Sequence, residues 1–227
     1  MFAPVSASSA EFPGIFGDIR PENGSTIRIN LNEFSYKKGS EIFGEKEPAD
    51  YVYQVTSGAV RSYKLLSDGR RQIAAFHLVG DTFGLEIGTE HRFTAEAVID
   101  TTVRLMKRRS LELVAQSDVM VAHNLLSMTA NNLRHAEDHM LLLGRKTSLE
   151  RVAAFLIEMD RRSTAAGILA LPMCRRDIAD YLGLTLETVS RALSRLHDLG
   201  TLGFIGNNQR QIVLLDRGKL ASLDLQH

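Results

Sequence analysis

Four polar side chains lie on one side of a predicted helix near the end of the chain, and their types suit the edges of DNA bases. They are Glu187, Ser190, Arg191 and Ser194, at steps of three, one and three residues. Glutamate can accept from the amino group of cytosine, arginine can donate two hydrogen bonds to guanine, and serine can contact either base. The other interpretation is a solvated helix face with an ion pair between Glu187 and Arg191.

The residues around this face fit two helices that meet at a sharp turn. Gly183 stands where the first helix ends in a left-handed conformation, and Thr185 stands where the second helix needs an N-cap. Glu187 follows in the first turn, near the positive end of the helix dipole. The apolar contact between the helices is supplied by Ile178, Leu182, Leu184, Val189 and Ala192, with Ala179 as the small residue. This spacing predicts a helix-turn-helix whose second helix enters the major groove.

Two kinds of DNA contact are therefore expected from this segment. Glu187, Ser190 and Arg191 are predicted to contact base edges. Hydroxyl and guanidinium groups next to them can donate to phosphate oxygens, which positions a protein on DNA without reading its sequence. The predicted phosphate contacts are Thr185, Thr188, Ser194, Arg195 and Arg175.

The elements that position this motif fall into zones that together predict an α+β fold. Residues 1–26 form a predicted tail, and residues 27–109 are short β-branched runs between glycines, typical of an antiparallel roll of jelly-roll type. Within that zone Ser67-Asp68-Gly69 has the composition of a hairpin turn. Residues 110–144 lack proline and glycine before Gly144 and are predicted to form one helix. Residues 145–227 predict three helices and a hairpin that turns at Asn207-Asn208, as in a winged helix-turn-helix.

The predicted helix over residues 110–144 carries a regular apolar row. Its members, spaced three or four residues apart as in helix-to-helix packing, are Leu126, Thr129, Leu133, Ala136, Met140 and Leu143. A helix of about 30 residues would be about 45 Å long, which is more than a roll of this size can cover. The row therefore predicts a homodimer, although a helix that only covers the roll is the simpler alternative.

Composition excludes several other classes. The 227 residues carry 27 basic and 27 acidic side chains, so the protein does not coat nucleic acid by bulk charge. Residues 1–145 hold 16 basic and 18 acidic side chains, and residues 146–227 hold 11 and 9, so the DNA-binding zone is only mildly basic. One cysteine excludes an internal disulfide framework. Without a long apolar run or a secretory signal, no membrane partner is expected and a cytoplasmic location is predicted.

No enzyme chemistry is predicted. The chain has no phosphate-binding loop, dinucleotide-binding motif or nucleophile elbow, and no catalytic residue is assigned. His135 and His139 lie four residues apart on a helix, but Ala136 stands where a metalloprotease motif needs glutamate, and no third ligand is evident. Neither a metal site nor a cofactor is therefore expected.

Three stretches resemble the CRP/FNR family of bacterial transcription regulators. The E-x-x-S-R run at residues 187–191 is similar to the recognition region of the FNR type, and residues 39–73 resemble the cyclic-nucleotide-binding-type β-roll. Residues 139–156 resemble the end of the dimer helix in FixK-type members. The resemblance implies a homodimer that reads a palindrome close to TTGA-N6-TCAA, docks RNA polymerase and mainly activates genes of microaerobic respiration, denitrification or nitrogen fixation.

The signal to which such a regulator would respond is less evident. The cysteines of an FNR-type iron–sulfur cluster are absent, and the family's cyclic-nucleotide cradle is altered, because Glu86 is displaced by one position and Phe93 replaces a hydroxyl residue. An effector-gated roll that binds another small molecule or haem is the alternative function. Cys174 precedes Arg175-Arg176 at a predicted helix start, where a thiolate is favoured, so we expect a redox-sensitive residue that inhibits DNA binding when oxidised. The alternative for Cys174 is an inert small side chain.

Overall fold

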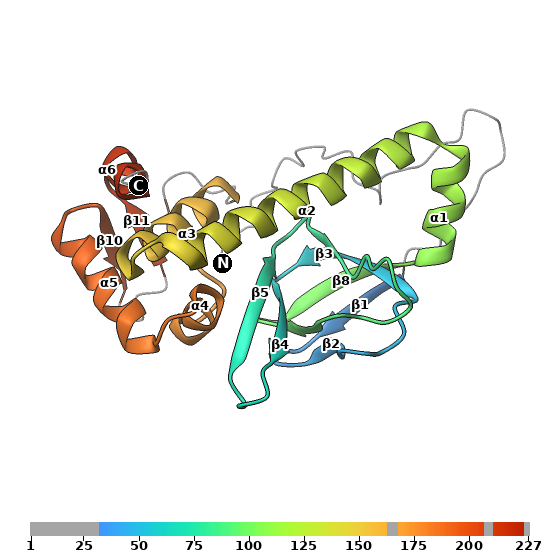
Figure 1. Ribbon diagram of the computed structural model, residues 1–227, viewed down its shortest axis with the longest axis horizontal. Coiled ribbons are helices and arrows are strands. Elements are labelled where there is room, and N and C mark those ends of the chain that lie inside the picture. Colours follow the sequence, from blue (N-terminus) through green and yellow to red (C-terminus); the bar gives the residue numbers. More distant parts are fainter. Residues whose placement is uncertain (1–31, 163–167, 207–210, 225–227) are drawn as a thin grey trace, which may run out of the picture.

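Residues 32–107 fold into a two-sheet roll at one end of the molecule (Figure 1). One sheet has the strand order β1-β8-β3-β6 and the other β2-β7-β4-β5, and the pairings are antiparallel. The strands are β1 (Asn32–Tyr36), β2 (Glu41–Phe43), β3 (Tyr51–Ser57), β4 (Val60–Leu65), β5 (Arg71–His77), β6 (Thr82–Phe83), β7 (Thr94–Ala97) and β8 (Thr101–Lys107). The predicted all-β zone is confirmed, and Gly69 has a φ of +82° in the turn between β4 and β5.

The computed structural model describes residues 32–162, 168–206 and 211–224. The predicted tail at residues 1–26, the predicted beginning of the roll at residue 27 and the predicted turn at Asn207-Asn208 lie outside these ranges. Within them, no helix is both long and apolar enough to cross a lipid bilayer.

Aromatic rings fill the interior of the roll. His91 stacks on Phe43 with ring centroids 3.6 Å apart, and beside them the rings of Tyr53 and Phe83 stack on each other with centroids 5.2 Å apart. Gly84 allows this packing, because its φ is +78° and a Cβ atom there would lie only 2.8 Å from the Tyr53 ring. The roll interior is therefore occupied by its own side chains around this cluster.

The predicted single helix over residues 110–144 is wrong in one respect, because two helices occupy this region. They are α1 (Arg108–Ser117) and α2 (Val119–Arg145), separated by Asp118 in an extended conformation. The Asp118 carboxylate accepts hydrogen bonds from the backbone N–H groups of Met120 and Val121 at 2.8 and 3.2 Å, so it acts as the N-cap of a new helix. Helix α1 packs on the roll, and the 27-residue α2, about 40 Å long, begins over the roll, where Val121 joins the same apolar cluster, and continues past it.

The remaining residues form the predicted winged helix-turn-helix, with additional elements. Its elements are α3 (Ser148–Arg162), β9 (Ile168–Ala170), α4 (Arg175–Leu182), α5 (Leu186–Asp198), β10 (Leu202–Ile205), β11 (Gln211–Leu214) and α6 (Arg217–Asp224). The prediction of three helices and a hairpin did not include β9, which pairs with β11, or α6, which packs on α3.

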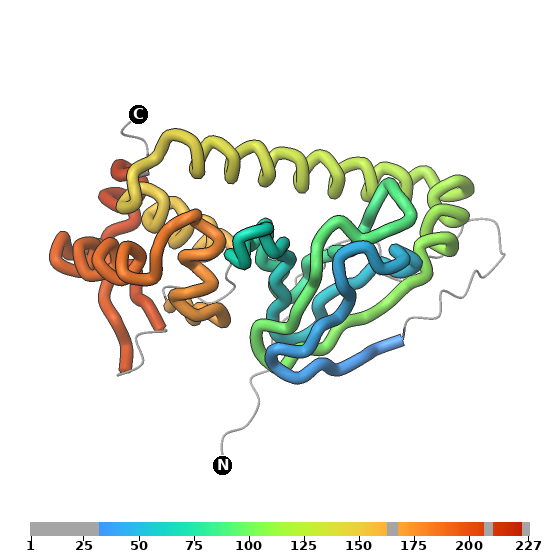
Figure 2. Tube along the Cα trace, turned by 60° about the horizontal axis from the view of Figure 1, so that its bottom comes forward, coloured from blue at the N-terminus to red at the C-terminus, as the bar shows by residue number. Residues whose placement is uncertain are grey.

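The roll and the helix-turn-helix domain contact each other directly while α2 spans both (Figure 2). Residues of the roll belong to the same buried apolar cluster as the core of α3, α4 and α5, and these are Ala59, Ile73, Phe76 and Val98. The Phe76 ring lies 5.2 Å from Tyr181 of α4 and 6.3 Å from Phe155 of α3. The two parts of the chain therefore share one continuous core.

Candidate nucleic-acid interface

The turn between α4 and α5 has the geometry that the sequence predicts. Gly183 ends α4 in the left-handed region, with φ of 61° and ψ of 39°. The Thr185 hydroxyl accepts from the backbone N–H of Thr188 at 3.2 Å and so caps α5. These two local features fix where one helix stops and the next begins.

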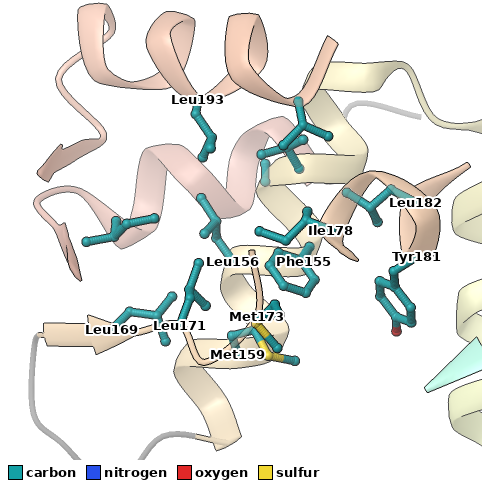
Figure 3. Close-up of a cluster of buried hydrophobic side chains, with 14 of the residues drawn as sticks. Phe155, Leu156, Met159, Leu169, Leu171, Met173, Ile178, Tyr181, Leu182 and Leu193 are labelled. Carbon is teal, nitrogen blue, oxygen red and sulfur yellow. The ribbon is translucent and has the colours of Figure 1, made fainter. Parts of the chain in front are cut away.

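Helix α5 presents one apolar and one polar side. Val189, Ala192, Leu193 and Leu196 are buried and face the helices beneath. In Figure 3, Leu193 points from α5 into the cluster that contains Phe155 and Leu156 of α3 and Ile178 of α4. This packing leaves the opposite side of α5 turned to solvent.

The exposed side carries the predicted base-reading residues. Glu187 and Arg191 are exposed, and neither has an ion-pair partner within the part of the chain that the structure describes. The structure therefore does not contain the Glu187–Arg191 ion pair of the alternative interpretation. Ser190 is half-buried, and its hydroxyl accepts from Arg175 Nη1 at 3.3 Å, which leaves its own proton available to a ligand.

The predicted phosphate contacts surround this face. Arg195 and Ser194 are exposed on α5, and the Ser194 hydroxyl donates to the Ser190 carbonyl at 3.1 Å. The hydroxyls of Thr185 and Thr188 lie 2.9 Å apart at the start of the helix. Arg175 lies over the Phe204 ring of β10, 6.0 Å from its centroid, and thereby joins α4 to the wing.

A positioning residue on α3 was missed by the sequence analysis. Arg151 of α3 donates to the carbonyls of Leu143 and Lys146 at the end of α2, at 2.8 and 2.9 Å. It also donates to the carbonyl of Leu182 at the end of α4, at 3.0 Å. One guanidinium thus connects the ends of α2 and α4, and no motif around it signals this role.

The predicted redox residue, Cys174, is the residue before α4 and is half-buried. Its Sγ atom donates a hydrogen bond to Asp177 Oδ2 at 3.2 Å, and its backbone N–H donates to the same oxygen at 3.2 Å. The thiol therefore lies against a buried carboxylate as well as beside the predicted pair Arg175-Arg176.

Most of the predicted dimer row is exposed along α2. Leu126, Leu133 and Met140 are 69, 60 and 66 % exposed, and Thr129 and Ala136 are exposed between them. The sixth predicted member differs, because Leu143 is half-buried and packs against the core of the helix-turn-helix domain. The exposed row therefore runs from Leu126 to Met140.

The altered nucleotide cradle in the roll makes internal contacts. Glu86 Oε1 accepts from the backbone N–H of Arg92 at 3.2 Å, and the Thr94 hydroxyl accepts from the backbone N–H of Glu45 at 3.0 Å. The half-buried Phe93 ring lies 5.5 Å from both the Arg92 guanidinium and the Lys64 ammonium. Both cations also pair with carboxylates of the roll, Lys64 with Glu45 at 2.9 Å and Arg92 with Glu86 at 3.8 Å.

His135 and His139 face the helix-turn-helix domain. His135 Nε2 lies 3.1 Å from Glu158 Oε1, and the His139 ring stacks on Tyr181 at 4.2 Å. Burial alone would raise the pKa of Glu158, but the hydrogen bonds and charges of His135 and Arg162 outweigh it and lower that pKa. Burial, with the neighbouring His135, lowers the pKa of His139. Among the described residues, no three potential metal ligands lie together.

Comparisons with known proteins match both halves of the chain. A model of the cyclic nucleotide-binding domain matches residues 33–118, and a model of the Crp-like helix-turn-helix domain matches residues 150–223. The chain is 46 % identical over 194 residues to the nitrogen fixation regulation protein FixK of Azorhizobium caulinodans, a match that covers 83 % of this chain and 77 % of that protein. It is 33 % identical over 194 residues to the transcriptional activator protein FnrL of Cereibacter sphaeroides, covering 82 % of this chain and 77 % of that protein. The structure of FixK2 from Bradyrhizobium japonicum matches with a TM-score of 0.82 and 70 % identity, covering 86 % of this chain and 97 % of that one.

Proposed function

Because the chain belongs to the FixK type of the CRP/FNR family of transcription regulators, we propose that it is a homodimeric activator that binds a palindrome close to TTGA-N6-TCAA. The observation that carries this proposal is the exposed side of α5, where Glu187 and Arg191 have no ion-pair partner among the described residues. An unpaired carboxylate and guanidinium are free to pair with a cytosine amino group and a guanine edge. Ser190, oriented by Arg175, supplies the third contact of each half-site.

The proposed dimer places one recognition helix on each half-site. In TTGA-N6-TCAA the half-site centres are about 10 base pairs apart, which is the one-turn spacing of dimeric helix-turn-helix proteins. The exposed row from Leu126 to Met140 supports pairing of α2 with its counterpart. Since each DNA-binding region is only mildly basic, linking two of them supplies the affinity that charge does not.

The relatives support a proposal for the biological setting. FixK of A. caulinodans is a nitrogen fixation regulation protein and FnrL of C. sphaeroides a transcriptional activator. We place this chain in the same kind of regulation, in the cytoplasm, with RNA polymerase as its partner and with genes of nitrogen fixation, denitrification or microaerobic respiration as its targets.

Binding without a cyclic nucleotide is the first expected result. Purified protein should shift a TTGA-N6-TCAA duplex in a gel, with the same midpoint in the presence and absence of cyclic AMP. The reason is that the Glu86 and Thr94 side chains are already bonded within the roll and Phe93 replaces a hydroxyl donor. A duplex with both TTGA and TCAA scrambled is the control. A midpoint concentration that changes tenfold with cyclic AMP contradicts this prediction and supports the alternative of an effector-gated roll. A tenfold change of the midpoint with haem supports the same alternative.

Oxidation of Cys174 is the second part of the proposal, and it is expected to inhibit binding. Peroxide should weaken DNA binding by wild-type protein at least tenfold, because an oxidised sulfur adds charge or bulk beside Asp177 at the start of α4. Cys174→Ser keeps a donor for Asp177 and should bind equally before and after peroxide. Equal affinity of treated and untreated wild-type protein contradicts the prediction and leaves Cys174 as an inert side chain.

A further inference from the structure

Two arginines of the roll reach the first helix of the DNA-binding motif. Arg61 of β4 donates to Asp177 Oδ1 at 2.8 Å, across 116 residues of sequence. Arg71 of β5 donates to the same oxygen at 2.6 Å, and its Nε and Nη2 atoms donate to Asp180 Oδ2 at 2.9 and 2.7 Å. We call these four residues the inter-domain ion cluster.

The cluster is largely shielded from water. The side chain of Asp177 is 4 % exposed and that of Arg61 14 %. Arg61 is itself held on the roll, because its Nη2 atom donates to Glu96 Oε1 of β7 at 2.5 Å. Beside the cluster, Gln72 Nε2 donates to the Tyr181 carbonyl of α4 at 3.2 Å. Helix α4 is therefore held against the β4–β5 side of the roll by several directional contacts, as the adjacent placement of β5 and α4 in both views shows (Figures 1 and 2).

Such contacts differ from apolar packing in what they specify. Two apolar surfaces can slide slightly on each other at little cost. A buried carboxylate that moves away from its arginine leaves its negative charge uncompensated, so one arrangement of α4 on the roll is strongly preferred. Asp177 accepts from Arg61, Arg71 and the Sγ and N–H of Cys174 at once. A rotation of α4 on the roll would separate these donors from the carboxylate.

We propose that Arg61 and Arg71 are positioning residues that set the half-site spacing this regulator recognises. The inference rests on the proposed function, because it concerns the same dimer and the same DNA. Helices α2 and α3 are joined by only two residues, Lys146 and Thr147, so contacts between the parts orient the DNA-binding domain on α2. Arg151 and the inter-domain ion cluster add directional hydrogen bonds to the shared apolar core and to the His135–Glu158 contact. Orientation in each subunit determines the distance between the two recognition helices of the dimer.

The test compares spacer preference with half-site affinity. Arg71→Asp and Asp180→Arg are made singly and together. Arg70→Asp is the matched control, since Arg70 lies next to Arg71 but is exposed and, among the residues that the structure describes, forms an ion pair only with Asp68 of its own hairpin. Binding is measured on duplexes with N5, N6 and N7 spacers and on a duplex with one half-site. Thermal unfolding of each variant verifies that it is folded. Arg71→Gln, which loses the charge without reversing it, is kept as a milder variant.

The wild-type protein and Arg70→Asp should prefer N6 over N5 and N7 by a large factor. Each single cluster variant should reduce that preference at least tenfold, while its affinity for one half-site changes less than twofold. The double variant should recover part of the preference, because it restores the ion pair between positions 71 and 180 with its charges exchanged but not the contact of position 71 with Asp177. Unchanged preference in folded single variants, or equal losses on every duplex, overturns the inference. If wild-type protein binds none of the duplexes, the proposed function itself fails.

Discussion

Replacing Arg191 by alanine is expected to weaken binding to TTGA-N6-TCAA more than any other single change on α5. A bidentate arginine–guanine contact discriminates by about 1–3 kcal/mol, which is about 5-fold to 150-fold for each half-site. A homodimer loses this contact twice. Since Arg191 is exposed and has no ion-pair partner in the described chain, its removal should leave the free energy of unfolding unchanged within about 0.5 kcal/mol.

The measurement is fluorescence anisotropy with the palindrome and with duplexes in which each half-site base pair is changed in turn. At one guanine position of the half-site, Arg191→Ala should bind duplexes with any of the three other base pairs about as tightly as it binds the unchanged palindrome. Arg176→Ala is the control, because Arg176 is an exposed arginine of α4 and its loss removes the same charge. The control should weaken all duplexes alike. An Arg191→Ala protein that weakens uniformly would make Arg191 a phosphate contact.

Placing aspartate at both Leu133 and Met140 is expected to give monomers that no longer bind the palindrome. These residues are 60 and 66 % exposed in the single chain, so the folded monomer should tolerate aspartate at both positions. In a dimer the same aspartates would be buried against a second α2, which is costly. Linking two sites commonly increases affinity 10²-fold to 10⁴-fold, and that gain is lost in a monomer. We therefore expect palindrome affinity to fall at least 100-fold.

Sedimentation velocity and anisotropy on the same samples test this. The matched control is Leu141→Asp, which introduces one aspartate on the same helix at a position that is 60 % exposed but lies beside the row. The control should remain dimeric and bind normally. If the double variant stays dimeric, or if it binds the palindrome as a monomer with unchanged affinity, α2 is not the dimer interface.

Local features of the fold were predictable from sequence. Gly183 lacks a side chain and so adopts the left-handed conformation that ends α4, and the Thr185 hydroxyl caps α5. Both residues behave as predicted. The alternation of strands and turns also identified the roll. Asp118 was overlooked, because one aspartate in a long helical pattern is compatible with an exposed position as well as with a cap.

The contacts between distant segments could not be predicted in the same way. Arg61 and Arg71 resemble ordinary solvated charges on strands until the fold brings Asp177 to them from more than 100 residues away. Arg151 likewise has no local signal, because its partners are backbone carbonyls that every residue possesses. Sequence patterns therefore located the residues that face DNA but not those that orient them.

The continuous core has a consequence for synthesis of the chain. A polypeptide leaves the ribosome from its N-terminus, so the roll is complete before α4 and α5 exist. Until they arrive, Ile73 and Phe76, which are buried in the finished molecule against α3 and α4, have no covering layer. A chain that stops before α3 therefore exposes Ile73 and Phe76, and these side chains are covered once α3 and α4 have been made.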